Sequence, residues 1–484
     1  MTAARTAAAP SEPASDTARL RQGIGLLDAT TLVVGSMIGS GIFIVSAESG
    51  RVAGSPGWLL AAWAIAGILT MLASLSCAEL AAMLPHAGGQ YVFFREAYGP
   101  LFGFLFGWTM FLVVQTGTIA AVAVAFGKFL GVFWPAISAS NKLLSIGRFS
   151  VSALQLVGLL VVGILTATNS TGLKAGTRTQ NVLTFAKFAA LFGLTALGLL
   201  LGHSGSFTSN SAGFWRAVSQ SGGTLTGFAL VAAVATAMVG PMFSQSAWNN
   251  VTFAAEEVRN PGWTLPRALL AGCVIVTTIY VLANVSYLNV LPFSGIQHAP
   301  EDRVATAAAT SLFGPGAAAV MAAAIMVSTF GCVNGLILSG ARVSFAMARD
   351  GLFFKELTRL NRAAVPANAL RAQALWAAVL MLSGSYSDLL KYVISADILF
   401  YVLLVLAVIV LRVRRPEWPR PFRAPGYPVV PLLYAAVGFA LIAILLSGNP
   451  RTTWPGYALV LTGVPAYFLW HRRRKTENGK RKTT

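Results

Sequence analysis

The sequence has few charged residues for its length. Only 11% of its 484 residues are charged, whereas 56% are hydrophobic, and the mean hydropathy is +0.69. A soluble domain of this size cannot bury so large an apolar fraction. The composition therefore excludes a soluble globular protein and predicts a chain that crosses a membrane many times.

Cysteine and histidine are also scarce, with three and four residues. Cys77, Cys273 and Cys332 all fall in apolar segments, without metal-ligand spacing and outside any loop where a disulfide could form. No nucleophile, metal-ligand set or phosphate-binding loop accompanies the acidic residues. The sequence therefore indicates no cofactor and no metal site, and it argues against an enzyme.

Acidic residues are outnumbered by basic ones, 16 to 35, and the net charge of +19 could suggest a nucleic acid partner. The placement of the basic residues indicates topology instead. With the N-terminus inside, most of them fall in inner loops and tails, and the outer loops hold only Arg51, Lys142, Arg148, Arg216, Arg303 and Arg451. This asymmetry follows the positive-inside rule, and it predicts a protein of the cytoplasmic (inner) membrane with both termini in the cytoplasm.

The chain contains many long apolar segments, and about 20 consecutive apolar residues suffice to cross a bilayer. Twelve spans are predicted, at residues 26–47, 58–84, 101–134, 151–168, 179–201, 224–253, 265–291, 313–347, 369–385, 388–411, 429–446 and 454–471. Residues 1–25, rich in Ala, Pro, Ser and Thr, are expected to form a disordered cytoplasmic tail. They lack the apolar core of a signal peptide. Residues 472–484 are expected to form a basic cytoplasmic tail.

The first span contains the stretch 34–43, with three glycines and two serines in eight residues. Glycine costs ~1 kcal/mol relative to alanine inside a helix, so this stretch favours a break. At a break within the bilayer, freed amides suit an anionic group and freed carbonyls suit a cation, as a zwitterion requires. The alternative is a small-residue packing seam, because Gly35 and Gly39 form a Gly-xxx-Gly pair.

The sixth span has a second interruption, at Val239-Gly240-Pro241. Interrupted helices at corresponding places in two halves are typical of transporters built from inverted repeats. The sequence therefore predicts an all-α membrane protein with a five-plus-five inverted repeat, the first at 26–202 and the second at 224–412. Spans eleven and twelve, at 429–471, lie outside the repeat.

Several motifs resemble those of the amino acid–polyamine–organocation (APC) superfamily, over about residues 24–471. They are Gly39-Ser40-Gly41-Ile42-Phe43, Cys77-Ala78-Glu79-Leu80, Gly88-Gly89-Gln90-Tyr91-Val92, Trp248-Asn249, Glu256-Glu257-Val258-Arg259-Asn260-Pro261, Gly331-Cys332-Val333-Asn334-Gly335 and Arg412-Val413-Arg414-Arg415-Pro416-Glu417. Within the superfamily, the chain resembles bacterial relatives of the L-type light chains of heteromeric exchangers. The resemblance implies a LeuT-type fold with helices 1 and 6 broken.

The resemblance also implies a substrate site at the two breaks. The amides of Gly39, Ser40 and Gly41 would hold the substrate carboxylate, and the carbonyls of Met37 and Phe243, with Ser246, would hold the ammonium. Phe243 would also close over the substrate as a gate, although an aromatic residue in an apolar span is more often packing. The substrate-binding set is completed by Ile38, Asn249 and Asp397.

Lys187 lies nine residues into span five, too deep to reach the bilayer surface easily. A lysine near the midplane costs at least ~2.5 kcal/mol, so it needs partners and is a functional candidate. By resemblance, its ammonium occupies the place of a sodium ion in sodium-coupled relatives, next to Ser328 and Cys332. The residue could then be a fixed cation, a structural clamp or a proton carrier.

Asp397, inside span ten, is as unusual as Lys187. Three roles stay open for it: recognition of a cationic side chain, a proton site, or a buried polar tie. Glu79 and Glu256-Glu257 close spans two and six at the inner face, and are expected to pair with inner arginines such as Arg178 or Arg342 and lock an inner gate.

The sequence thus predicts a sodium-independent amino acid transporter that exchanges neutral L-amino acids by alternating access. A proton-coupled symporter and a carrier of cationic amino acids or polyamines that uses Asp397 are the alternatives, and a channel is the alternative from another class. Animal light chains use a cysteine in the loop corresponding to 135–150 to bond an ancillary subunit. This loop has none, so we expect a monomer without such a partner.

Overall fold

The computed structural model describes residues 22–482 except 139, 147–148, 203–212, 384–385 and 449. Within that part of the chain the protein is a bundle of helices with one short β-hairpin, β1 Lys142–Ile146 and β2 Phe149–Ser152. The hairpin lies in the predicted outer loop 135–150 and was not expected. Except for residues 22–25, the tail predicted at 1–25 lies outside the described residues.

Nine helical segments of the described chain are long and apolar enough to cross a membrane, or ten when α1 (Leu26–Met37) and α2 (Gly41–Ala53) count as one bent span. The others are α3 (Pro56–Met83), α5 (Pro100–Thr109) with η1 (Met110–Val114) and α6 (Gln115–Leu130), α7 (Ala153–Ser170), α8 (Leu173–Leu201), α10 (Gly227–Ala237) with α11 (Val239–Ser244), α13 (Pro261–Val290), α16 (Ala317–Arg349), α18 (Tyr386–Arg414) and α19 (Val429–Gly448). The two remaining predicted spans correspond to α17 (Ala367–Ser383) and α20 (Pro450–Lys482). Their apolar stretches, residues 367–382 and 456–470, are shorter.

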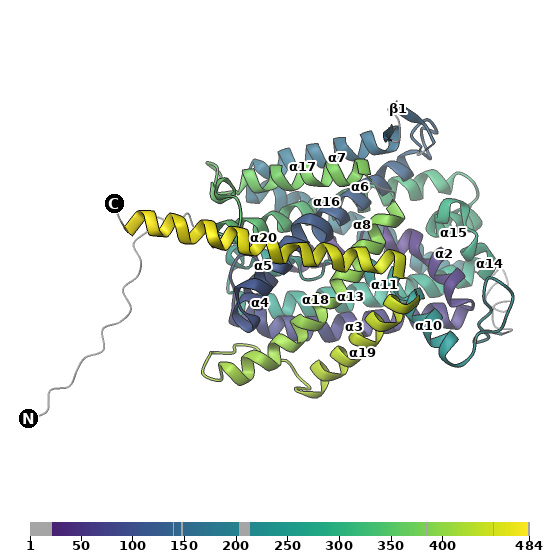
Figure 1. Ribbon diagram of the computed structural model, residues 1–484. Helices are drawn as coiled ribbons and strands as arrows, with labels where there is room; N and C mark the ends of the chain where they lie inside the picture. The colour runs from purple at the N-terminus through teal and green to yellow at the C-terminus, as the bar shows by residue number, and fades with distance from the viewer. Residues whose placement is uncertain are drawn as a thin grey trace, which may run out of the picture.

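The long helices run side by side, so the bundle has two ends (Figure 1). One end carries α4 (Gln90–Tyr98) and the C-terminal part of α20, and we call it the α4 end. The other carries β1, α14 (Phe293–Gln297) and α15 (Val304–Phe313), and we call it the α14 end. The α4 helix lies between the second and third predicted spans, 58–84 and 101–134.

The first apolar segment leaves the helical conformation at Ile38–Ser40, and its axis bends by 40° between α1 and α2. Ile38 has φ −76° and ψ 89°, and the amide of Gly39 donates to the carbonyl of Met37 over 2.9 Å. This is the geometry of an inverse γ-turn. The interruption therefore lies within the glycine- and serine-rich stretch, as the sequence predicts.

The second interruption lies elsewhere than the sequence predicts. The chain is helical through Val239-Gly240-Pro241, with a single turn residue at Met238, and it leaves the helix only at Gln245–Asn249. A proline is tolerated in the first turn of a helix, where its missing N–H has no partner in any case. The helix ends at Ser244, and Ala247 in the following non-helical segment adopts a left-handed φ of 65°. Beyond it come α12 (Asn250–Phe253) and η2 (Ala255–Glu257).

α2 and α11 pack unusually closely, and glycines allow it. A Cβ atom on Gly240 would lie 2.0 Å from Cγ1 of Val45, and one on Gly41 would lie 2.1 Å from Oγ of Ser244. Small residues bring membrane helices together in this way, because dispersion contacts rather than hydrophobic burial drive their association. The glycines of the two interrupted segments thus act as a packing seam as well as helix breakers.

At the α4 end, a buried ion pair ties η2 to α16. Arg342 donates to both carboxylate oxygens of Glu257, over 2.7 and 3.0 Å, and the two side chains are 1% and 2% exposed. The backbone carbonyl of Glu257 also accepts from the amides of Gly23 and Ile24. The start of α1, the segment after α12 and α16 are therefore joined at one point.

Glu79, at the end of α3, pairs with different arginines from those expected. Arg412 donates to both of its carboxylate oxygens, over 2.8 and 2.6 Å, and the backbone amide of Ala424 adds a third bond of 2.7 Å. Arg420 approaches to 3.6 Å. The side chain of Arg178 lies outside the described residues. Sequence spacing could not reveal these partners, because they lie more than 330 residues further along the chain.

We predict that Gly240→Val destabilises the protein and that Val45→Ala restores part of the loss. Overpacking a tight contact costs roughly 1–3 kcal/mol, and removing the facing side chain makes room. Thermal unfolding of the purified protein in detergent would report both changes. Gly163→Ala is the matched control, since nothing lies within 4 Å of its added Cβ, and it should not lower the melting temperature. Equal melting temperatures for Gly240→Val and wild type would contradict the packing described.

For the buried pair, we predict that Arg342→Met or Glu257→Gln alone lowers the melting temperature more than the two together. A single substitution leaves a buried charge unpaired, at roughly 3–5 kcal/mol, whereas the double variant removes both charges. The more exposed pair Arg349–Glu256, with 34% and 20% exposure, is the control, and its loss should cost about 0–1 kcal/mol. Additive effects at Arg342 and Glu257 would show that the two charges are not coupled.

Candidate functional site

The break between α1 and α2 frees backbone carbonyls in the core of the bundle, and Lys187 of α8 binds two of them. Its ammonium donates to the carbonyl oxygens of Gly35 and Ile38, the latter over 2.8 Å, and the side chain is fully buried. Gly331 of α16 allows α8 to approach closely, since a Cβ there would lie 2.9 Å from Cβ of Leu183. The lysine charge is thus held by carbonyl dipoles, as a bound cation would be.

Three further side chains complete the hydrogen bonding of this break. Ser328 and Cys332, both from α16, donate to Ile38 and Ser36, over 3.3 and 3.1 Å. Tyr280 of α13 donates to Met37 over 3.0 Å. Irregular backbone is tolerated at membrane depth only where such partners exist. The structure therefore brings together Lys187, Ser328 and Cys332 at the freed carbonyls of the first segment.

One face of α8 forms hydrogen bonds with α1 and the break after it at three positions. Asn181 donates to Asp28 over 2.6 Å, Thr184 donates to the carbonyl of Thr31 over 3.2 Å, and Lys187 reaches Gly35 and Ile38. Residues three apart share a helix face. The spacing 181, 184, 187 of polar residues in an apolar span is a signal that sequence reasoning missed, apart from the lysine.

The carbonyls of Met37 and Phe243, the two expected to hold an ammonium, already accept hydrogen bonds in this conformation. Met37 accepts from Gly39 and Tyr280, and Phe243 accepts from both the amide and the hydroxyl of Ser246, over 3.0 and 2.7 Å. A carbonyl oxygen has two lone pairs. An incoming ammonium would therefore have to replace a protein donor, such as the Ser246 hydroxyl.

The N-terminus of α2 is formed by the residues expected to hold a carboxylate. Ser40 is the N-cap and Gly41 the first helical residue, in a helix of 13 residues. The first amides of a helix have no partner within it, and the helix dipole adds partial positive charge there. Four residues before the N-cap Ser40, the hydroxyl of Ser36 is buried and has no hydrogen-bond partner among the described residues. The sequence alone does not predict a role for Ser36.

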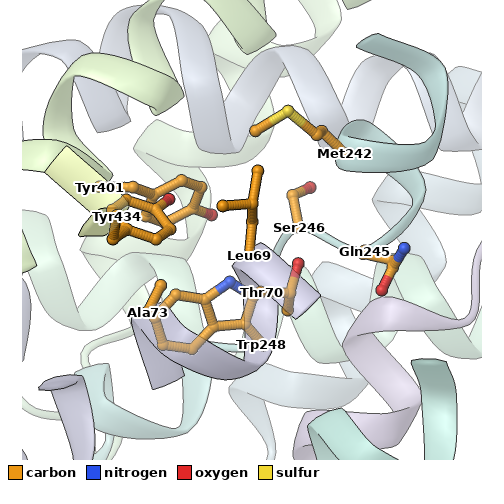
Figure 2. A pocket seen from close by; sticks show the side chains of 9 residues that line it. All are labelled: Leu69, Thr70, Ala73, Met242, Gln245, Ser246, Trp248, Tyr401 and Tyr434. Atoms are coloured by element: carbon orange, nitrogen blue, oxygen red, sulfur yellow. The ribbon is translucent and has the colours of Figure 1, made fainter. Parts of the chain in front are cut away.

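A small cavity adjoins the second interruption (Figure 2). Ser246 and Trp248 line it, together with Met242 and the rings of Tyr401 and Tyr434. Trp248 stacks on Tyr401 with ring centroids 5.4 Å apart. The cavity has a volume of about 10 Å³, which is room for one water molecule. Phe243, the expected gate, is buried with 6% exposure.

A second cavity of about the same size, 10 Å³, shares Ser246 and Tyr401 with the first. Asp397 lines it, as do Asn249 and Asn250. The π-helical turn η1 contributes Met110 and Val114 to the wall, and such turns are frequent at functional sites. Like the first cavity, this one has room for about one water molecule.

Asn249 connects the second interruption to the α4 end. Its side-chain amide donates to Oε1 of Gln90 over 2.7 Å, and the amide of Gly88 donates to the carbonyl of Phe253 over 3.0 Å. The start of α4 is therefore fastened to the residues that follow the break. Any movement of α12 would be transmitted to α4.

Comparison with known proteins fits this geometry. The profile of the amino acid permease family matches residues 24–465. The serine/threonine exchanger SteT of Bacillus subtilis is 31% identical over 94% of this chain and 98% of its own. The large neutral amino acids transporter small subunit 2 of Mus musculus is 31% identical, over 95% and 83%. The human Asc-type amino acid transporter 1 is 30% identical, over 96% and 85%. The chain belongs to the amino acid permease family, within the APC superfamily, and is a multi-pass membrane protein that transports amino acids.

Proposed function

We propose that the protein is a sodium-independent exchanger of neutral L-amino acids that works by alternating access. The observation that carries this proposal is the first break, where Lys187 supplies a positive charge to the freed carbonyls of Gly35 and Ile38. A built-in cation leaves no need for a sodium ion at that position. The α2 N-terminus beside it is suited to a carboxylate, so that a zwitterion would be held by backbone groups.

The proposed architecture is that of a LeuT-type fold, with twelve spans, a five-plus-five inverted repeat at 26–202 and 224–412, and the segments α1–α2 and α10–α12 as broken helices. Two observations support it: the interruptions at Ile38–Ser40 and Gln245–Asn249, and the close packing of α2 on α11. The α4 end is then cytoplasmic, with both chain termini, and the membrane is the inner one. The ion pairs of Glu257 and Glu79 would form the inner gate.

Binding would use the residues of the two breaks. Gly39, Ser40 and Gly41 take the carboxylate, and Met37 and Phe243, with Ser246, take the ammonium. Ile38 and Asn249 line the site, and Phe243 closes it. Because the protein already satisfies both carbonyls, the substrate replaces internal donors, which would couple binding to rearrangement of the break.

Proton coupling is the second candidate, and full burial of Lys187 favours it. Among the described residues its ammonium donates to the neutral carbonyls of Gly35 and Ile38, and no carboxylate pairs with it. The fixed-cation role is the simpler, since the two carbonyl bonds stabilise the charged form. A channel is disfavoured because the polar groups gather at the two breaks.

We further propose that the protein acts as a monomer, without a disulfide-linked subunit. Its three cysteines are all buried and unbonded, and the 135–150 loop has none. One of the similar proteins is called a small subunit, whereas the exchanger SteT carries no such name.

The proposal predicts counterflow. Purified protein in liposomes loaded with an unlabelled neutral amino acid should take up the labelled amino acid against its gradient, equally with and without sodium. Empty liposomes should show little uptake, because an exchanger needs a substrate on both sides. Uptake that depends on a sodium gradient would refute sodium independence, and downhill flux without counterflow would indicate a channel.

We also predict that Lys187→Met lowers exchange by at least about tenfold, since a charge-assisted hydrogen bond is worth ~1.5–3 kcal/mol and its loss leaves buried carbonyls unpaired. The matched control is Lys128→Met, because Lys128 donates to the backbone carbonyl of Glu301 at the α14 end, away from the break. Initial rates of counterflow, measured with and without a pH gradient, distinguish a fixed cation from a proton carrier. A fixed cation predicts that wild-type uptake ignores the gradient. Full exchange and an unchanged proton response in Lys187→Met would contradict both roles.

A further inference from the structure

A third cavity, of about 410 Å³, lies at the α14 end and shares no lining residue with the two small cavities near the second interruption. We call it the α14 pocket. Its volume falls within the range of small-molecule sites, roughly 300–1,000 Å³. The lining comes from α2, from the segment before α10 and from α14 with the residue after it (Figure 1), and it includes Arg51, Val218, Gln220, Phe293, Gln297 and His298.

Arg51 brings a positive charge to this pocket and keeps unused hydrogen-bond donors. Its Nη1 atom donates to the carbonyl of Gln297 over 2.6 Å and to Oδ1 of Asp302 over 2.8 Å. A guanidinium carries five N–H donors, and this one makes no further hydrogen bond within the described part of the chain. Because the side chain is 29% exposed, a carboxylate that enters the pocket can bind to its remaining N–H groups.

Two side chains of the same lining keep acceptor atoms. Gln297 donates through Nε2 to the carbonyl of Gly50 over 3.1 Å, so its Oε1 is the acceptor that remains. His298 donates through Nδ1 to the carbonyl of Ser294 over 3.0 Å, so Nε2 of the neutral ring is an acceptor as well. Neither acceptor receives a hydrogen bond from a described residue. The pocket therefore combines a positively charged donor with acceptors that suit a hydroxyl or an ammonium.

The pocket also has an apolar part. Cε2 of Phe293 would lie 3.4 Å from a Cβ on Gly50, so this ring packs against α2. Val218 is a hydrophobic side chain left 39% exposed. A ligand that fits the pocket thus carries a carboxylate, a hydrogen-bond donor close to it and an apolar group. Amino acids and 2-hydroxy acids share this chemistry, because both bear the donor on the carbon next to the carboxylate.

The walls of the α14 pocket belong to both interrupted spans. The α2 helix follows the first interruption, and residues 218–226 lead into α10, which precedes the second. The amide of Val218 donates to the carbonyl of Gly54 over 3.1 Å, and Arg51 and Gln297 tie α2 to α14. A ligand that contacts all three walls stabilises this arrangement relative to any state in which the two spans separate at this end.

We propose that the α14 pocket is a ligand site, separate from the two breaks, for a small carboxylate with an adjacent hydroxyl or ammonium, and that its occupancy slows exchange. Arg51 binds the carboxylate, and Gln297 and His298 accept from the adjacent donor. The effect on exchange rests on the proposed function, whereas the binding itself does not.

Binding is tested on the purified protein in detergent with labelled 3-phenyllactate, which has no ammonium and so lacks one end of the zwitterion proposed to bind at the breaks. Wild type should bind it saturably, and about tenfold more tightly than 3-phenylpropionate, which lacks the hydroxyl. Displacement of the label by L-phenylalanine assigns the site to amino acids as well, and displacement by 2-hydroxy acids alone assigns it to these. The absence of saturable binding, or equal affinity for the two acids, would overturn the site.

Arg51→Gln should weaken binding of 3-phenyllactate by about tenfold, since it removes the charged donor. It also breaks the ion pair with Asp302, so Asp302→Asn is the matched control: it breaks the same pair but keeps Arg51, and binding should persist or tighten. Arg216→Gln removes an exposed arginine outside the lining and should change nothing. Equal losses in Arg51→Gln and Asp302→Asn would show that the ion pair serves only to support the fold.

His298→Leu is the second variant, at an exposed position whose replacement leaves the fold intact. It should lower the preference for 3-phenyllactate over 3-phenylpropionate by about threefold or more, because one of the two acceptors is lost. An unchanged preference would remove His298 from the site.

The effect on exchange is measured in proteoliposome counterflow of a labelled neutral amino acid. External 3-phenyllactate should lower the maximal rate about twofold or more without raising KM, and Arg51→Gln should abolish this inhibition. A raised KM would mean that the acid binds at the breaks, and an unchanged rate with bound acid would refute the coupling. Failure of wild type to exchange any amino acid would refute the proposed function, whereas binding to the purified protein would still report on the pocket.

Discussion

The interaction on which the rest of this structure depends is the one between Lys187 and the freed carbonyls of Gly35 and Ile38. A helix broken in the middle of a membrane exposes polar backbone groups where no water can satisfy them. Here a cation from α8 and hydroxyl and thiol groups from α13 and α16 do so. The break therefore needs no bound ion to satisfy these carbonyls, and we propose that the backbone at the start of α2 binds the substrate.

The other polar groups near the two interruptions also differ in whether they have hydrogen-bond partners. The carbonyls of Met37 and Phe243 accept hydrogen bonds within the protein, whereas the buried side chains of Ser36 and Asn250 have unpaired polar atoms among the described residues. Polar groups that have hydrogen-bond partners stabilise the present arrangement of the helices. Polar groups without partners favour a ligand-bound state in which the ligand supplies them. An alternating-access carrier needs both, because it must close around its substrate without being locked in that state. At the α4 end, Glu257 and Arg342 join three segments at one buried point, and α4 is fastened to the residues after the second break by Asn249 and Gln90.

Much of the fold could be predicted from the sequence because apolar length and glycine content act locally. The first helical segment is interrupted inside the predicted glycine- and serine-rich stretch, since glycine and serine weaken a helix wherever they cluster. The second interruption was placed several residues too early, because Gly240-Pro241 can be read as a breaker although proline fits a first turn and glycine serves the contact with Val45. Lys187 could be singled out by its depth alone. The pairing of Glu79 with Arg412, the π-helical turn and the meeting of Asn250 with Asp397 depend on contacts between distant segments, and no local pattern encodes them.

The central claim is that backbone groups at two breaks bind both charged ends of an amino acid. The most direct measurement compares counterflow of one good substrate with that of its methyl ester and its N-acetyl derivative, which lack the carboxylate charge and the ammonium charge respectively. The account predicts exchange of the free amino acid and neither derivative, since each removes one end of the zwitterion. Exchange of either derivative at the rate of the parent amino acid would contradict it.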